Sequence, residues 1–267
     1  MNDITLVLGI DAKTVEQLKA SWPTWRRNRA EMWDWPWVVF YDQDQLDGAA
    51  VQDLLIDVIG KGPEITFVPW PYPGIGAAAY ESQRERMLSG HVFVPADFVR
   101  TKWHMKLDTD ALARPHKEWI DPTWFEGDPA YVAPRWHYSK GVGFLDRLDV
   151  WGDELQKFSV KPMLPRLEIP HDPLALRVGH QRMCSWCSYY LTEFTGMVAE
   201  ACSGCVNGFQ KLPVPSQDTT AWYVAARIGL PHRIENMKAR GWSNHSRINE
   251  LRRVSAEIME MPCPSPA

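Results

Sequence analysis

The stretch Lys102-Trp-His-Met-Lys-Leu-Asp-Thr-Asp-Ala111 decides how the rest of this chain is interpreted. Apolar Trp103, Met105 and Leu107 alternate along it, as in a β-strand with one well-buried face, and then Asp108-Thr-Asp110 follows. Two carboxylates one residue apart at the end of a strand can converge on one hard cation, for which Mg²⁺ or Mn²⁺ fits best. In open α/β sheets this is also the edge where ligands bind. An acidic turn after a strand is the competing interpretation, and a bare D-x-D does not decide between the two.

Upstream of this stretch, short apolar runs alternate with helical patterns. Strands are expected at 5–10, 37–41 and 65–70, and the first two are followed by Asp11 and Asp42. Helices are expected at 14–29, with an end or kink before Pro23, and at 51–59 and 77–89. This alternation indicates βαβ units and a mostly parallel sheet. The G-x-G-x-x-G fingerprint is missing, so a dinucleotide cofactor is not supported.

Downstream of Asp110 the chain is rich in proline and aromatic residues. Helices are expected at 143–157, 181–201, 218–228 and 248–259, with a strand at 206–212. We expect one domain at 1–247, with halves 1–113 and 114–247, followed by a C-terminal helix and tail at 248–267.

Composition excludes several classes of protein. The 267 residues are 45% apolar and 23% charged, as in an ordinary globular protein, and the net charge of -4 with no basic run argues against a nucleic-acid partner. We expect no transmembrane segment, because no apolar run approaches about 20 residues. The N-terminus shows no secretory signal, so a cytoplasmic location is the default expectation.

Taken in order, several short motifs across residues 5–247 resemble those of GT-A glycosyltransferases, which use nucleotide-sugar donors. They are the strands ending at Asp11 and Asp42, the loop and helix Gly74–Arg86, Asp108-Thr-Asp110, Cys205-Val-Asn-Gly-Phe209, the helix Gln217–Gly229, and His245. The order and spacing carry the resemblance, because each motif is short. Three features depart from the pattern: Gln217 replaces the usual first acid, the segment 91–101 is lengthened, and Lys106 occupies an often apolar position. The K-x-D-x-D arrangement resembles the galactosyltransferase and Fringe branch.

The resemblance implies a fold and a set of roles. The fold is a Rossmann-like α/β/α sandwich with a mostly parallel sheet. The implied contacts to the nucleotide sugar come from Asp11, Asp42, Arg84, Arg86, Lys106 and Asp108. Mn²⁺ or Mg²⁺ is implied at Asp108, Asp110 and His245, and Asp218 is implied as the catalytic base of an inverting reaction.

Each of these side chains also has a structural interpretation. Asp218 suits a helix N-terminus, Arg84 and Arg86 a solvated helix face, and His245 a surface turn. Asp11 and Asp42 suit strand-end turns.

Aromatic side chains in the second half are candidates for binding the acceptor, although packing is the simpler role for each one: Trp136, His137, Tyr138, Trp151 and Trp222.

Four cysteines form a separate pattern. Cys184, Cys187, Cys202 and Cys205 have C-x₂-C-x₁₄-C-x₂-C spacing, which is close to that of a structural four-thiolate Zn²⁺ site. Buried thiols and reversible disulfides are the alternatives, and Cys263 lies in the tail.

The sequence therefore predicts a metal-dependent, hexosyltransferase-like glycosyltransferase that moves a sugar from a nucleotide diphosphate, expected to be UDP, to a hydroxyl acceptor. A nucleotidyltransferase and a zinc-stabilised binding module with an inactive transferase core are the alternatives. A phosphatase of the haloacid-dehalogenase type is disfavoured, because its D-x-D lies at the first strand with Thr or Val after the second Asp. Here the pair follows three β units and is followed by Ala111.

Overall fold

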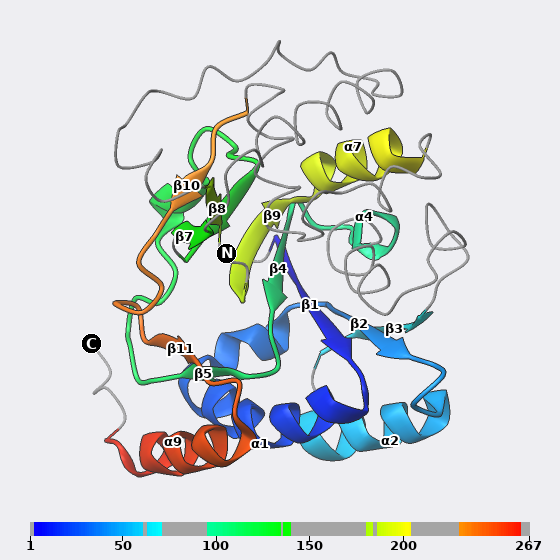
Figure 1. The fold of residues 1–267 in the computed structure, drawn as a ribbon, viewed down its shortest axis with the longest axis vertical. Helices are drawn as coiled ribbons and strands as arrows, with labels where there is room; N and C mark the ends of the chain where they lie inside the picture. The colour runs from blue at the N-terminus through cyan, green and yellow to red at the C-terminus, as the bar shows by residue number, and fades with distance from the viewer. Residues whose placement is uncertain are drawn as a thin grey trace.

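The computed structural model describes residues 3–60, 63–70, 95–134, 136–139, 180–183, 186–203 and 230–262. Within these ranges one sheet has seven strands in the order β10-β6-β9-β4-β1-β2-β3 (Figure 1). Helices cover it on both sides, so the expected α/β/α arrangement with a mostly parallel sheet is confirmed.

Four strands form the parallel half: β1 (Ile4–Ile10), β2 (Trp37–Asp42), β3 (Ile65–Trp70) and β4 (Trp103–Leu107). β1 lies between β2 and β4 and is parallel to both, and β2 is parallel to β3. The strands expected at 5–10, 37–41 and 65–70 are confirmed to within one residue at each end, and the strand expected at 206–212 lies outside the described residues.

The second half of the sheet contains β6 (Tyr131–Ala133), β9 (Cys187–Leu191) and β10 (Arg233–Ile234). β9 is antiparallel to both β4 and β6, and β10 is parallel to β6. Two antiparallel ribbons stand apart from this sheet: β5 (Ala111–Ala113) with β11 (Trp242–Asn244), and β7 (Trp136–Ser139) with β8 (His180–Met183).

The two faces of the sheet follow from the alternation of side chains along β1. Leu6 and Leu8 pack in the large core with α1 (Ala12–Asn28) and α2 (Gly48–Ile59). Val7 points the other way and packs with Val99, which follows the short α4 (Pro95–Phe98). α7 (Thr192–Ser203) lies on the same side as α4 in Figure 1. Two 3₁₀ turns, η1 (Ala30–Asp34) and η3 (Pro122–Phe125), complete the described helical elements.

The expected end before Pro23 is wrong, because α1 runs through this residue to Asn28. Side chains on both sides of the proline are held in place. Ser21 donates to the carbonyl of Thr109 at 2.6 Å, and the Trp25 indole donates to the carbonyl of Ala111 at 2.7 Å. Contacts with the segment after β4 therefore outweigh the local penalty of the proline.

The helix expected at 181–201 is also partly wrong. The structure has β8 and β9 in its first half, and only the second half is the helix α7. Cys187-Ser-Tyr-Tyr-Leu191 is buried along its whole length between β4 and β6. A strand enclosed on both edges and both faces loses the alternation of polar and apolar residues that identifies strands in a sequence.

The C-terminal helix α9 (Ile248–Glu260) packs along α1, and its expected range is confirmed to within one residue. The buried face of α9 consists of Leu251, Val254 and Ile258, and these side chains form one cluster with Leu112 of β5. Arg27 of α1 donates to the carbonyls of Ile258, Met259 and Met261 at the end of α9. The Ile258 carbonyl also accepts from the backbone N–H of Met261, so Arg27 adds to the bonds that close this helix. None of the helices in the described ranges is both long and apolar enough to cross a bilayer.

A buried arginine fixes the turn that leads into β11. The guanidinium of Arg29 lies over the rings of Trp119 and Trp242, 5.1 and 4.9 Å from their centroids, and the two rings contact each other edge-on. The guanidinium also donates to the carbonyl of Arg240 at 3.0 Å. Burial lowers the pKa of Arg29 to about 10. Gly241 continues this turn at φ +83°, a conformation that suits glycine. The start of β11 is therefore attached to the end of α1.

Candidate functional site

Three acidic residues meet at one edge of the sheet. Asp11 follows β1, Asp42 ends β2 and Asp108 follows β4, and these three strands run parallel. Because parallel strands end at the same edge, the sequence pattern alone brings these residues to one side of the molecule.

The loop Asp108-Thr-Asp110 is fixed by its neighbours. The backbone N–H of Asp108 donates to the carbonyl of Trp186 at 2.8 Å. Thr109 is buried, and its hydroxyl donates to Gln17 Oε1 at 3.1 Å. The buried ammonium group of Lys106 contacts Asp108 Oδ1, while 39% of the Asp108 side chain remains exposed. The loop is therefore held by α1 and by the segment before β9.

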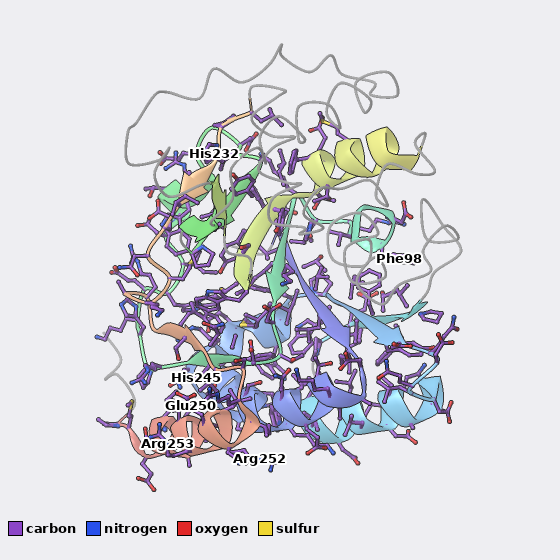
Figure 2. The ribbon with its side chains drawn as sticks, viewed as in Figure 1. Phe98, His232, His245, Glu250, Arg252 and Arg253 are labelled. Atoms are coloured by element: carbon purple, nitrogen blue, oxygen red, sulfur yellow. The ribbon has the colours of Figure 1, made fainter. Side chains whose placement is uncertain are left out.

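The ribbon of β5 and β11 places His245 beside Asp110. Asn244 lies opposite Ala111 in the ribbon, and the backbone N–H of His245 donates to the carbonyl of Asp110 at 3.1 Å. Burial raises the pKa of Asp110 to about 6, and the neighbouring carboxylate of Asp108 adds to the effect, whereas Lys106 opposes it. Figure 2 shows His245 next to Glu250 at the start of α9.

Two buried polar atoms at this site lack partners among the described residues. They are Asp110 Oδ1 and His245 Nε2, one carboxylate oxygen and one imidazole nitrogen. Both atom types are common ligands of Mn²⁺, and a cation would offset the repulsion between the two carboxylates. As arranged here, no group of three or more His, Cys, Asp or Glu side chains in the described ranges is able to hold a metal ion. Asp108 contacts Lys106, so the atoms left to bind a cation are Asp110 Oδ1 and His245 Nε2, and the chemistry of both suits a hard divalent cation.

No family model and no curated protein matches this sequence. Solved structures do match. Core-mannan synthase A from Aspergillus fumigatus, in its Mn/GDP form, is similar with a TM-score of 0.56 and 11% identity, over 88% of this chain and 73% of that chain. The mannosyltransferase Ktr4p from S. cerevisiae is similar with a TM-score of 0.54 and 10% identity, over 85% of this chain and 66% of its own. The chain has a GT-A fold. At this level of identity the similarity concerns the arrangement of strands and helices, and residue roles are argued from the site itself.

In this GT-A fold, Asp11 and Asp42 both have local structural partners. Asp11 is the N-cap of α1, where its carboxylate accepts from the backbone N–H of Thr14 at 2.7 Å. Asp42 accepts from the backbone N–H of Asp44 at 3.0 Å and from the side chain of Gln45 at 2.6 Å. Both side chains therefore shape the turns at the edge of the sheet, and their contact with a nucleotide stays a prediction.

Several predicted site residues lie outside the described ranges of the GT-A fold: Arg84, Arg86, Trp151, Cys184, Cys205, Asp218 and Trp222. Trp136, His137 and Tyr138 lie on β7, where the backbone alone is described. Among the cysteines, Cys187 is buried opposite Leu107 at one end of β9 and is in no disulfide within the described residues, whereas Cys202 lies near the far end of the following helix α7. Zinc binding by these four cysteines stays a prediction.

Sequence reasoning missed three residues that support the D-x-D loop and His245. Gln17 and Ser21 on α1 bond to Thr109, and Glu250 on α9 lies 3.2 Å from His245 Nδ1. Only the short spacing between His245 and Glu250, at the start of a predicted helix, was visible in the sequence as a signal.

Proposed function

We propose that this chain is a metal-dependent glycosyltransferase that moves a sugar from a nucleoside diphosphate donor to a hydroxyl acceptor. The observation that carries the proposal is a pair of buried atoms at the carboxyl end of β4, Asp110 Oδ1 and His245 Nε2. Both can bind a metal ion, and neither has a partner among the described residues. In a GT-A fold this edge of the sheet faces the position of a bound nucleotide. Core-mannan synthase A is described in an Mn/GDP form and the mannosyltransferase Ktr4p in complex with GDP, and both descriptions agree with this proposal.

In this proposal one group of residues binds the cation and a second group positions the D-x-D loop. Mn²⁺ or Mg²⁺ would be held by Asp110, His245 and Asp108, and when bound it supplies Lewis acidity that neutralises the charge developing on the diphosphate leaving group. Lys106 holds Asp108 beside this position and adds a positive charge to an otherwise acidic loop. Gln17 and Ser21 hold Thr109, so the two carboxylates keep their places on a fixed backbone.

We also propose the finer parts of the reaction. An inverting transfer needs a carboxylate that takes the proton from the acceptor hydroxyl, and Asp218 is the candidate base. The sequence resemblance implies UDP, whereas core-mannan synthase A and Ktr4p are described with GDP, so the nucleotide base is the first point to test.

The test is a thermal-shift measurement with UDP and with GDP, each with and without Mn²⁺. At a ligand concentration of 100 Kd, binding adds about 2.7 kcal/mol, or roughly 5–10 °C in Tm for a chain of this size. We expect such a shift with one nucleotide, only with Mn²⁺ present, and its loss in Asp110→Asn. Asp53→Asn, an exposed change on α2, is the matched control and should keep the shift.

The outcomes separate the alternatives. A metal-dependent shift combined with slow hydrolysis of the matching nucleotide sugar supports the transferase. Binding without hydrolysis or transfer favours the inactive binding module, and a preference for triphosphates favours a nucleotidyltransferase. An unchanged shift in Asp110→Asn would refute the metal site.

A further inference from the structure

The two ring nitrogens of His245 have different surroundings. Nδ1 lies 3.2 Å from Glu250 Oε1, whereas Nε2 is buried and has no partner among the described residues. The imidazole is mostly enclosed, with 20% of the side chain exposed, so its orientation depends on these neighbours. An ionised carboxylate accepts hydrogen bonds and donates none, so the proton of a neutral imidazole must be on Nδ1. The lone pair is then on Nε2.

We propose that Glu250 is a positioning residue that keeps the lone pair of His245 Nε2 available to a cation at Asp110. The inference rests on the proposed function, since it assigns a role to Glu250 at that same metal site. Histidine ligands of metals usually donate their second N–H to a carboxylate or carbonyl, which fixes both tautomer and ring orientation.

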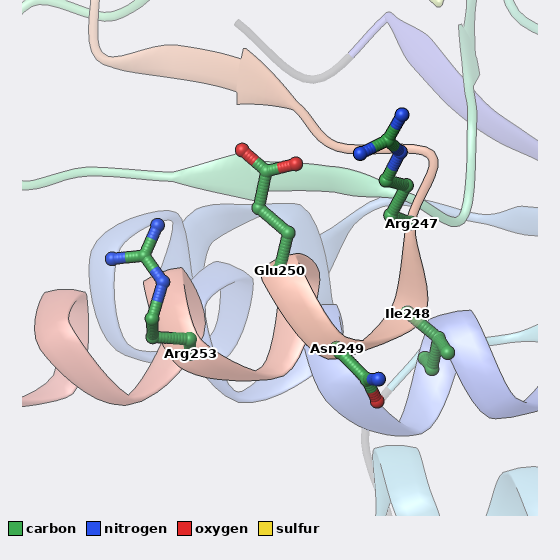
Figure 3. A pocket seen from close by; sticks show the side chains of 5 residues that line it. All are labelled: Arg247, Ile248, Asn249, Glu250 and Arg253. Carbon is green, nitrogen blue, oxygen red and sulfur yellow. The ribbon is translucent and has the colours of Figure 1, made fainter.

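The fold supplies a rigid mount for Glu250. It lies in the first turn of α9, where an acidic side chain is stabilised by the helix dipole. Leu251 and Val254 bury the inner face of α9, and Arg27 binds the carbonyls at its far end. Figure 3 shows the Glu250 side chain leaving α9 on the same side as that of Arg247, and away from Ile248 and Asn249. The carboxylate is thus held by a helix that is fixed to α1 along its length.

The charges around Glu250 leave it available to His245. Arg247, Glu250 and Arg253 line an open hollow of about 610 Å³ at the start of α9. Arg253 pairs with Glu257, one turn further along the helix. Glu250 is half-exposed, so the pair with His245 is reachable by solvent and its strength depends on how well the ring is held. Its effect is therefore expected on metal affinity more than on the stability of the fold.

The first test measures Mn²⁺ alone, by electron paramagnetic resonance of the free ion. We expect Glu250→Ala to weaken Mn²⁺ binding by roughly 10–100-fold. Glu250→Gln should lose less, because its amide oxygen still accepts from Nδ1. Glu260→Gln, an exposed change at the far end of the same helix, is the matched control and should bind Mn²⁺ as the natural chain does. In a His245→Ala background, Glu250→Ala should cause no further loss, which a general destabilisation of α9 would not reproduce.

The second test measures the tautomer directly, by ¹⁵N chemical shifts of labelled histidine, with His245→Ala assigning the signal. The natural chain should show the Nδ1–H form, and Glu250→Ala should show a mixture of tautomers. Mn²⁺ affinity within twofold of the natural chain in Glu250→Ala, or an unchanged tautomer, would overturn the role of Glu250. If the natural chain binds no Mn²⁺, the proposed metal site fails, and the tautomer measurement still decides whether Glu250 orients the ring.

Discussion

His104 makes the stability of this protein depend on pH in a calculable way. The residue lies on β4, two strand positions before Lys106, and its side chain is fully buried. Its ring stacks on Tyr190 with centroids 5.5 Å apart, its Nδ1 lies 3.3 Å from Thr192 Oγ1, and its Nε2 has no partner in the described residues. Burial lowers the pKa of His104 to about 3, because a charged imidazole there would have no water and no carboxylate.

The sign and size follow from proton linkage. Between the folded pKa of about 3 and the unfolded pKa of about 6.5, the unfolded chain binds more protons than the folded chain at this position. The free energy of unfolding therefore falls as the pH is lowered through this window and is unaffected by His104 above it. At pH 5 the unfolded imidazole is almost fully protonated and the folded one is not, so this group removes about 2 kcal/mol relative to pH 8.

The assay is urea unfolding at pH 8 and pH 5, followed by both tryptophan fluorescence and circular dichroism so that a single transition can be verified. His104→Gln should reduce the loss of stability between the two pH values by about 2 kcal/mol, whatever its own baseline stability. His232→Gln is a matched control. Burial lowers the pKa of His232 as well, but its ring is only partly enclosed, so this variant should change the loss of stability between the two pH values by less than His104→Gln does. Equal losses in the natural chain and in His104→Gln would refute the reasoning.

Three further changes test how β11 and α9 are attached, each by urea unfolding at pH 7. Gly241→Ala should cost about 1–3 kcal/mol, since φ is +83° and the added Cβ would lie 2.8 Å from the carbonyl oxygen of Arg114; an unchanged unfolding midpoint would contradict this. Arg27→Ala should cost about 1–3 kcal/mol by removing the side-chain donor of the Met259 and Met261 carbonyls at the end of α9, whereas Arg253→Ala, on an exposed pair, should cost less than about 1 kcal/mol. Arg29→Lys should cost at least about 2 kcal/mol, because an ammonium keeps the charge but loses the contact of the planar guanidinium with two indole rings. Equal stability of this variant and the natural chain would show that the charge alone matters there.

Elements whose residues carry a local signal could be predicted from the sequence. The strands ending at Ile10, Asp42 and Trp70 are short apolar runs, and α2 ends before Gly60, which has φ +76°. α9 is confirmed because its apolar residues recur at helical spacing. In each case the pattern and the boundary residue agree, so little depends on distant parts of the chain.

Elements governed by distant contacts could not be predicted in this way. α1 continues through Pro23 because residues on both sides of it bond to the segment after β4. β9 is a strand because it pairs with β4 on one edge and β6 on the other. The sequence of Cys187–Leu191 contains no pattern that predicts these two pairings.

The sequence by itself determined the parallel half of the sheet and the place of Asp108 and Asp110 at its carboxyl edge, because strand alternation and parallel pairing are local or repetitive properties. Only the tertiary structure decided what those carboxylates meet. The pairing of β5 with β11 joins segments far apart in the chain and brings His245 to Asp110, and the docking of α9 on α1 brings Glu250 to His245. Such pairings are set by which surfaces bury one another, and that is a property of the whole fold.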